Sequence, residues 1–104
     1  MIRSKTLATR LAKECRRSLK AYPAFRSIGD VTEPLPGSGV FQFMIWGDSL
    51  RPREPGSGSI QSRAYVMVQP MLDVLVEHDQ YFPDELLECI FRNTEGITIS
   101  RVQS

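Results

Sequence analysis

The chain has 104 residues, a hydrophobic fraction of 41%, a charged fraction of 24% and a formal net charge of +1, values that are typical of a globular protein and argue against intrinsic disorder. This length supports one modest hydrophobic core, so we expect a single domain over residues 1–104, and no apolar run approaches the roughly eighteen residues of a membrane span. Two cysteines without a CxxC spacing argue against a disulfide framework or a structural zinc site, and the cytoplasm is the expected compartment.

Residues 4–22 are predicted to form one amphipathic helix. Ser4 or Thr6 is the expected N-cap, and Pro23 ends the helix because the residue before a proline is pushed out of the helical region. Apolar residues share one face at spacings of three and four, namely Ala8, Leu11, Ala12, Cys15, Leu19 and Tyr22. The opposite face carries what we call the basic stripe: Arg10, Lys13, Arg17 and Lys20.

The middle of the chain indicates a short edge strand over residues 26–32 and then an antiparallel hairpin. The first hairpin strand is "VFQFMIW" (residues 40–46), which is apolar on both faces and so suits a strand covered on each side. The second is "RAYVMVQ" (residues 63–69), with Ala64, Val66 and Val68 facing one way. Between them lies a Pro-, Gly- and Ser-rich segment, which predicts a long projecting loop over residues 48–62 that carries Arg51 and Arg53.

Residues 70–80 fit two structures. With a period of two, Val66, Val68, Pro70, Leu72, Val74 and Val76 form one line, which predicts a long strand with a bulge at Pro70. With a period of 3.6, Pro70 takes the first position of a helix. The many β-branched residues favour the strand.

The C-terminal part predicts a helix over residues 83–93 and a strand over residues 96–102. Leu86, Leu87 and Ile90 form the expected buried face of this helix, Gly96 can end it, and Ile97 and Ile99 point inward from the strand. The fold class is therefore α+β, with a small mixed or antiparallel sheet of about four strands, two or three helices packed on one face, and a long loop in the central hairpin.

The residues with reactive or titratable side chains do not form a recognisable catalytic, cofactor or metal site. His78 is flanked by Glu77 and Asp79, but neither a strand nor a helix makes these three side chains converge, so we interpret it as a surface or half-buried histidine. Cys15 and Cys89 lie on or beside apolar helix faces and are expected to be small buried hydrophobes, although Arg16 and Arg17 would activate Cys15 if it were exposed. We expect a protein that is not an enzyme and has no cofactor.

Charge is unevenly distributed along the chain. Residues 1–31 hold eight basic and two acidic side chains, a balance of +6, whereas residues 32–104 hold five and ten, a balance of −5. Opposite charges of this kind can pair within a monomer or head to tail between copies, and repeated head-to-tail contacts give rings or filaments. We therefore predict an assembly or interaction subunit, a homo-oligomer or part of a larger complex. The predicted contact residues are Arg10, Lys13, Arg17, Lys20, Arg51, Arg53, Asp84, Glu85 and Glu88.

The order of the elements, a helix and then a hairpin with a long loop, is similar to that of the small ring-forming neck and tail-terminator proteins of tailed bacteriophages. That resemblance implies a virion component. The alternative function is nucleic-acid binding by the basic stripe, as in a small regulator or inhibitor, through phosphate contacts with little sequence discrimination because the helix lacks Asn and Gln. Binding to anionic lipid ranks third, since the apolar side of the helix has no Trp or Phe.

Overall fold

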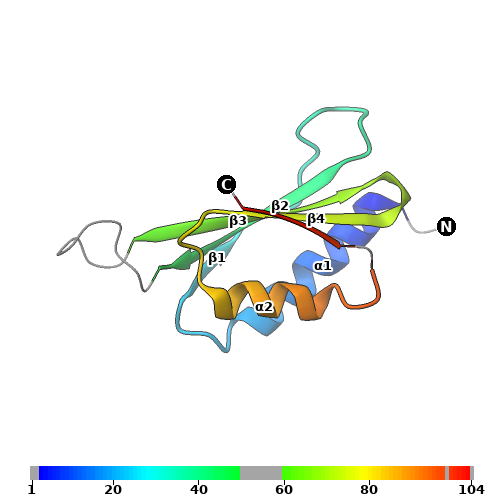
Figure 1. The fold of residues 1–104 in the computed structure, drawn as a ribbon. Coiled ribbons are helices and arrows are strands. Elements are labelled where there is room, and N and C mark those ends of the chain that lie inside the picture. Colours follow the sequence, from blue (N-terminus) through cyan, green and yellow to red (C-terminus); the bar gives the residue numbers. More distant parts are fainter. Residues whose placement is uncertain (1–2, 50–59, 98, 104) are drawn as a thin grey trace.

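A computed structural model describes residues 3–49, 60–97 and 99–103 of the chain, the last of these ranges for its backbone only. The elements follow one another as α1 (Ser4–Leu19), β1 (Phe25–Ile28), β2 (Phe41–Asp48), β3 (Gln61–Gln69), a short helical turn η1 (Pro70–Leu72), β4 (Asp73–His78), α2 (Asp84–Asn93) and β5 (Ile99–Gln103) (Figure 1).

The strands form one sheet in the order of the sequence, β1-β2-β3-β4-β5. The first four are antiparallel to their neighbours, and β5 runs parallel to β4. The predicted α+β class is confirmed, with two helices. The predicted strand over residues 96–102 corresponds to β5, and the edge strand expected over residues 26–32 ends at Ile28, followed by an isolated bridge between Thr32 and Gln42.

Both helices cover the same face of the sheet (Figure 1). That face is apolar because alternate residues of β2, β3 and β4 point into it, namely Phe43, Ile45, Ala64, Val66, Val68, Val74 and Val76, all of them buried. Helix α1 covers it with the apolar face expected from its spacing, from Ala8 to Leu19, and Leu7 joins that face. Burying these alternating sets against one another supplies the hydrophobic core.

Both ends of α1 differ from the prediction. The helix ends at Leu19 rather than at residue 22. Tyr22 lies half-buried in the following turn, and its backbone amide donates to the Leu19 carbonyl at 3.0 Å. Neither Ser4 nor Thr6 is the N-cap. Arg3 takes that position without a capping hydrogen bond, while Ser4 Oγ donates to the Gln69 carbonyl at 3.0 Å and so ties α1 to the end of β3.

Helix α2 buries Leu86, Cys89, Ile90 and Phe91. The sequence predicted Leu86, Leu87 and Ile90 for this face and Cys89 as a buried residue beside it. Leu87 is only half-buried, and the burial of Phe91 was not predicted. The buried face is therefore wider than predicted, because Cys89 and Phe91 extend it on either side of Leu86 and Ile90.

A single long strand bulged at Pro70 is not what forms after residue 69. The chain instead reverses at Pro70–Leu72, and β4 pairs with β3 in the register Val66↔Val76 and Val68↔Val74. Residues directly opposite each other in an antiparallel pair share a face, which is why the period of two continued across the reversal. The strand interpretation is correct for residues 73–78, and its continuity with residues 66–69 is wrong.

The prediction that residues 40–46 are covered on each side is also wrong. Both helices lie on one face of the sheet (Figure 1). Met44 and Trp46 alternate along β2 with the buried Phe43 and Ile45, so they lie on the other face. We call that side of the sheet the helix-free face. It carries half-buried apolar side chains from three strands: Met44, Trp46, Tyr65, Met67 and Leu75.

The projecting loop predicted over residues 48–62 is shorter than predicted, because the two flanking strands extend into it. Strand β2 continues through Asp48, β3 begins at Gln61, and the Ser49 amide donates to the Ile60 carbonyl at 2.7 Å, which extends the ladder. Arg51 and Arg53 lie outside the described residues, so this part of the prediction stays a prediction.

Candidate interaction surfaces

The basic stripe lies on the exposed side of α1, away from the sheet. Arg10, Lys13, Arg17 and Lys20 are all exposed, as predicted from their spacing. Arg17 pairs with Glu14 one turn earlier on the same helix. Within the described part of the chain, Arg10, Lys13 and Lys20 form no ion pair. Three of the four cations are therefore available to a partner.

The predicted acidic contacts lie on α2. Asp84 and Glu85 form its first turn and Glu88 follows one turn later, all three exposed. Carboxylates near a helix N-terminus are stabilised by the helix dipole, so this charge needs no cation to offset it. Among the residues that the structure describes, the ion pairs are Arg17–Glu14 and Arg26–Asp48, and neither joins the basic stripe to these acids.

The helices contact each other through other residues. Ser18 Oγ lies 3.4 Å from Asn93 Oδ1, and Arg92 donates to the Tyr22 hydroxyl. These contacts join the C-terminal parts of α1 and α2 and leave both charged groups facing outward. The basic side chains of α1 and the acidic side chains of α2 therefore do not neutralise one another through contacts between the described helices.

Two surface depressions lie at opposite ends of strand β2. Phe41 begins the strand and Ser49 follows its last residue, so about 25 Å separate these two positions. The start of α1 and the β3–β4 turn lie at the Phe41 end, which we call the Met71 end, and the start of α2 lies at the Ser49 end, which we call the Asp84 end (Figure 1).

The Met71 end contains an apolar groove of about 690 Å³. Its lining comprises Arg3, Ser4, Lys5, Gly39, Phe41, Pro70, Met71 and Leu72. Met71 is 92% exposed, an unusual position for a large apolar side chain. Arg3 and Lys5 are exposed beside it, so this end combines apolar surface with positive charge.

Backbone geometry holds Met71 in that position. Met71 and Leu72 have φ values of 71° and 62°, in the left-handed region that non-glycine residues rarely adopt. Gln69 pairs with Asp73, so this turn is a three-residue loop, and loop positions with positive φ are usually occupied by Gly, Asn or Asp. With Met-Leu instead, the reversal carried no turn signal, and sequence reasoning missed both the turn and the exposed methionine.

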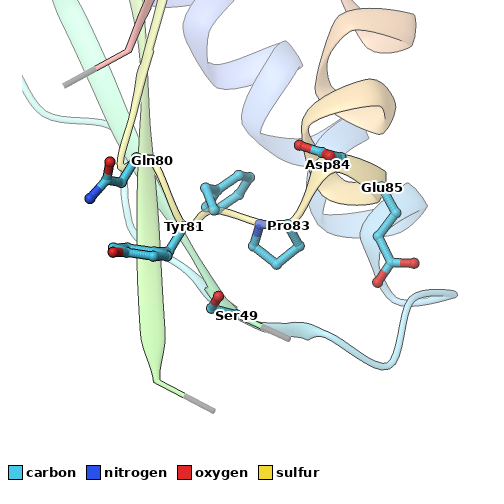
Figure 2. Close-up of a pocket in the computed structure, with 7 residues that line it drawn as sticks. Ser49, Gln80, Tyr81, Pro83, Asp84 and Glu85 are labelled. Carbon is cyan, nitrogen blue, oxygen red and sulfur yellow. The ribbon is translucent and has the colours of Figure 1, made fainter. Parts of the chain in front are cut away.

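The Asp84 end contains a smaller hollow of about 210 Å³. Figure 2 shows its lining, which comprises Ser49, Gln80, Tyr81, Phe82, Pro83, Asp84 and Glu85. Most of these residues come from the segment between β4 and α2, and Asp79 fixes that segment because its Oδ1 accepts from the Tyr81 amide at 2.8 Å. This end therefore combines an aromatic and proline hollow with two exposed carboxylates.

The two cysteines line neither depression, whereas His78 ends β4 close to the segment that forms the hollow. Cys15 and Cys89 are free and buried, as the sequence predicted, and burial, followed by nearby Cys89 and Glu14, raises the pKa of the Cys15 thiol to about 12. Burial also raises the pKa of Cys89. His78 is half-buried, with Nδ1 3.1 Å from the Asp79 carbonyl oxygen. The described residues contain no group of three or more His, Cys, Asp or Glu side chains placed to hold a metal ion.

No protein-family model matches this chain, and searches of curated proteins and of solved structures find no significant match. None of the helices in the described ranges has the length and apolar character needed to cross a membrane.

Proposed function

We propose that this protein is a non-enzymatic assembly subunit that binds other protein chains through its charged ends. The observation that carries the proposal is the location of the charge. Basic side chains at the start of α1 and acidic side chains at the start of α2 are exposed at opposite ends of the sheet, and the described ion pairs do not join them. Charge placed in this way is available to steer and orient a partner.

The composition of the helix-free face also supports a protein partner. Trp, Tyr and Met are enriched in protein interfaces, and this face carries Trp46, Tyr65 and Met67. Glu77 lies opposite Tyr65 and Asp73 opposite Gln69 on the same face. The negative charge of these carboxylates repels nucleic-acid phosphates from this face.

Capture of the tagged full-length chain from its native cells tests the proposal. We expect a protein partner in fixed stoichiometry, and we expect the variant Asp84→Lys/Glu85→Lys to lose it while it keeps the same circular dichroism spectrum. An Asp30→Lys variant is the matched control, because Asp30 is also an exposed carboxylate but lines neither surface depression. A wild-type chain that is recovered alone and sediments as a monomer contradicts the proposal.

Nucleic-acid binding by α1 is the second candidate, favoured by Arg10, Lys13 and Lys20, which are exposed and form no ion pair with the residues that the structure describes. Replacing these three and Arg17 by Gln should reduce the salt dependence of binding by up to about four phosphate contacts. A mobility-shift titration of the unmodified protein at about 50 mM salt, where phosphate contacts are strong, tests this candidate first. The absence of any shift there excludes it.

A ring-forming neck or tail component of a virion is one kind of assembly that this proposal covers. Such a subunit is made in the cytoplasm and ends in the particle. Its support is the order of the elements together with the charged ends.

A further inference from the structure

We infer that the Met71 end of one copy binds the Asp84 end of a second copy, head to tail, with Met71 inserted into the hollow beside Tyr81 and Pro83. The inference rests on the proposed function, because it names the partner as another copy of this chain. Three features carry it: an exposed apolar side chain, a hollow that can receive it, and opposite charges around the two.

The inserted side chain is Met71. It is 92% exposed and stands on a turn whose two positive φ values hold it away from the sheet. A methionine side chain is flexible and polarizable, so it adapts to an irregular hollow and makes favourable contacts with aromatic rings. The structure thus displays the side chain best suited to filling a pocket at the point where the chain projects.

The receiving site is the hollow at the Asp84 end. Its volume of about 210 Å³ accommodates one thioether side chain, and Tyr81, Phe82 and Pro83 supply apolar walls. The segment that forms it is fixed by the Asp79 carboxylate and by the hydrogen bond from the Phe82 amide to the Asp79 carbonyl at 3.0 Å. The hollow is therefore formed before a partner arrives, which lowers the entropic cost of binding.

Charge selects the same pairing. Arg3 and Lys5 flank Met71, and Asp84 and Glu85 flank the hollow. All four are exposed, and in the described part of the chain none of them forms an ion pair. Insertion of Met71 brings the two cations to the two carboxylates, whereas contact between two identical ends sets like charges against each other.

The two ends cannot meet within one molecule, because about 25 Å of β2 separates them. Contact between copies therefore leaves one free Met71 and one free hollow in each dimer. A contact of this kind repeats until it closes into a ring or extends into a filament.

Sedimentation velocity at low salt with two variants tests the inference. Met71→Glu removes the inserted side chain and keeps the hollow, whereas Asp84→Lys/Glu85→Lys reverses the charge at the hollow and keeps Met71. We expect the wild type to form species larger than a dimer as its concentration rises, and each variant alone to lose at least tenfold in association.

Mixing the two variants is the decisive measurement. Met71→Glu keeps an intact hollow, and Asp84→Lys/Glu85→Lys keeps an intact Met71 end. One copy of each variant can therefore pair, and the mixture should form a dimer and nothing larger. Leu35→Glu is the matched control, since Leu35 is also a large exposed apolar side chain, at 69%, but lines neither the groove nor the hollow. That variant should assemble like the wild type, and circular dichroism should show all variants folded.

A charge exchange gives an independent readout. Lys5→Glu should weaken association, and adding Glu85→Lys in the same chain should restore it. A wild type that stays monomeric at every concentration, variants that do not complement each other, or a dimer that each variant leaves intact overturns the inference. If the chain is monomeric but loses a different protein partner with Asp84→Lys/Glu85→Lys, the inference fails while the proposed function stands.

Discussion

Gly47 lets helix α2 approach the sheet. A Cβ atom built at Gly47 would lie 2.5 Å from Leu86 Cδ1 and 3.3 Å from the Ala24 carbonyl oxygen. The leucine can move by a rotamer change, but the carbonyl belongs to backbone that itself accepts from the Asp48 amide at 2.7 Å. The missing side chain is therefore part of the packing of α2 on β2.

Gly47→Ala should lower the free energy of unfolding by about 1–3 kcal/mol, the usual effect of overpacking a core. Urea unfolding measures the loss. Gly29→Ala is the control, since its Cβ meets Met44 atoms at ordinary distances of 3.7 and 3.9 Å. The control should be neutral or stabilised by up to about 1 kcal/mol. Equal destabilisation of both variants would contradict this account.

Cys15 makes stability depend on alkaline pH. Burial and the nearby Cys89 and Glu14 raise its pKa from 9.0 to about 12 in the folded protein, and the unfolded thiol titrates near its ordinary value. The unfolded state therefore loses a proton that the folded state keeps, so stability present below pH 9 falls between about pH 9 and pH 12. The contribution of this one thiol has a slope of up to about 1.4 kcal/mol per pH unit.

Comparison of the wild type with Cys15→Ala isolates that slope from those of lysines and tyrosines that titrate in the same range. Urea unfolding at several alkaline pH values should show the two stabilities converging as pH rises. Parallel curves would show that the thiol does not contribute.

At the level of elements, spacing and proline predicted most of what forms. The buried positions from Ala8 to Leu19 follow from residue spacing alone, and the alternation of Ala64, Val66 and Val68 gave the inner face of β3. Spacing did not determine which side of β2 is left without helices, because "VFQFMIW" is apolar on both sides. It also did not reveal the reversal at Pro70–Leu72, where the residue types present rarely adopt the backbone conformation that forms.

Helix α1 begins without a capping side chain, since Arg3 stands at the N-cap. Arg3→Asp should stabilise the protein by about 1 kcal/mol, because a carboxylate there accepts from the orphan amides and interacts well with the helix dipole. Thermal unfolding measures the gain. Arg3→Ala is the control and should not show it. If Arg3→Asp were no more stable than Arg3→Ala, the capping account would be wrong.

At the scale of the whole molecule, the site depended on features that composition cannot show. The charge imbalance between the two sequence halves was visible, but the positions of its members at opposite ends of β2 came from the path of the chain. The hollow at Tyr81 and Pro83 and the exposure of Met71 arise from the β4–α2 connection and the β3–β4 turn. Neither has a residue pattern of its own.

In the β3–β4 turn, the residue that favours assembly lowers the stability of the fold. Replacing Met71 by Asn installs a residue suited to positive φ at a position that is 92% exposed, and it should raise the free energy of unfolding by about 1 kcal/mol. The same variant removes the exposed methionine, so association in sedimentation velocity should fall. Pro36→Ala is the control for the association readout, because Pro36 is in another turn and lines neither depression. A variant that is no more stable than the wild type would show that the turn holds no strain.

The edge strand β1 resists the addition of a strand from another copy. It has only four residues, its register with β2 shifts between Phe25 and Ser27, and Arg26 is exposed on it. Short, irregular and charged edges resist strand addition from another molecule. A polymer built by contact between the Met71 end and the Asp84 end would grow lengthwise along β2, and its fibre diffraction would show a repeat of one subunit rather than the roughly 4.7 Å spacing of cross-β stacking.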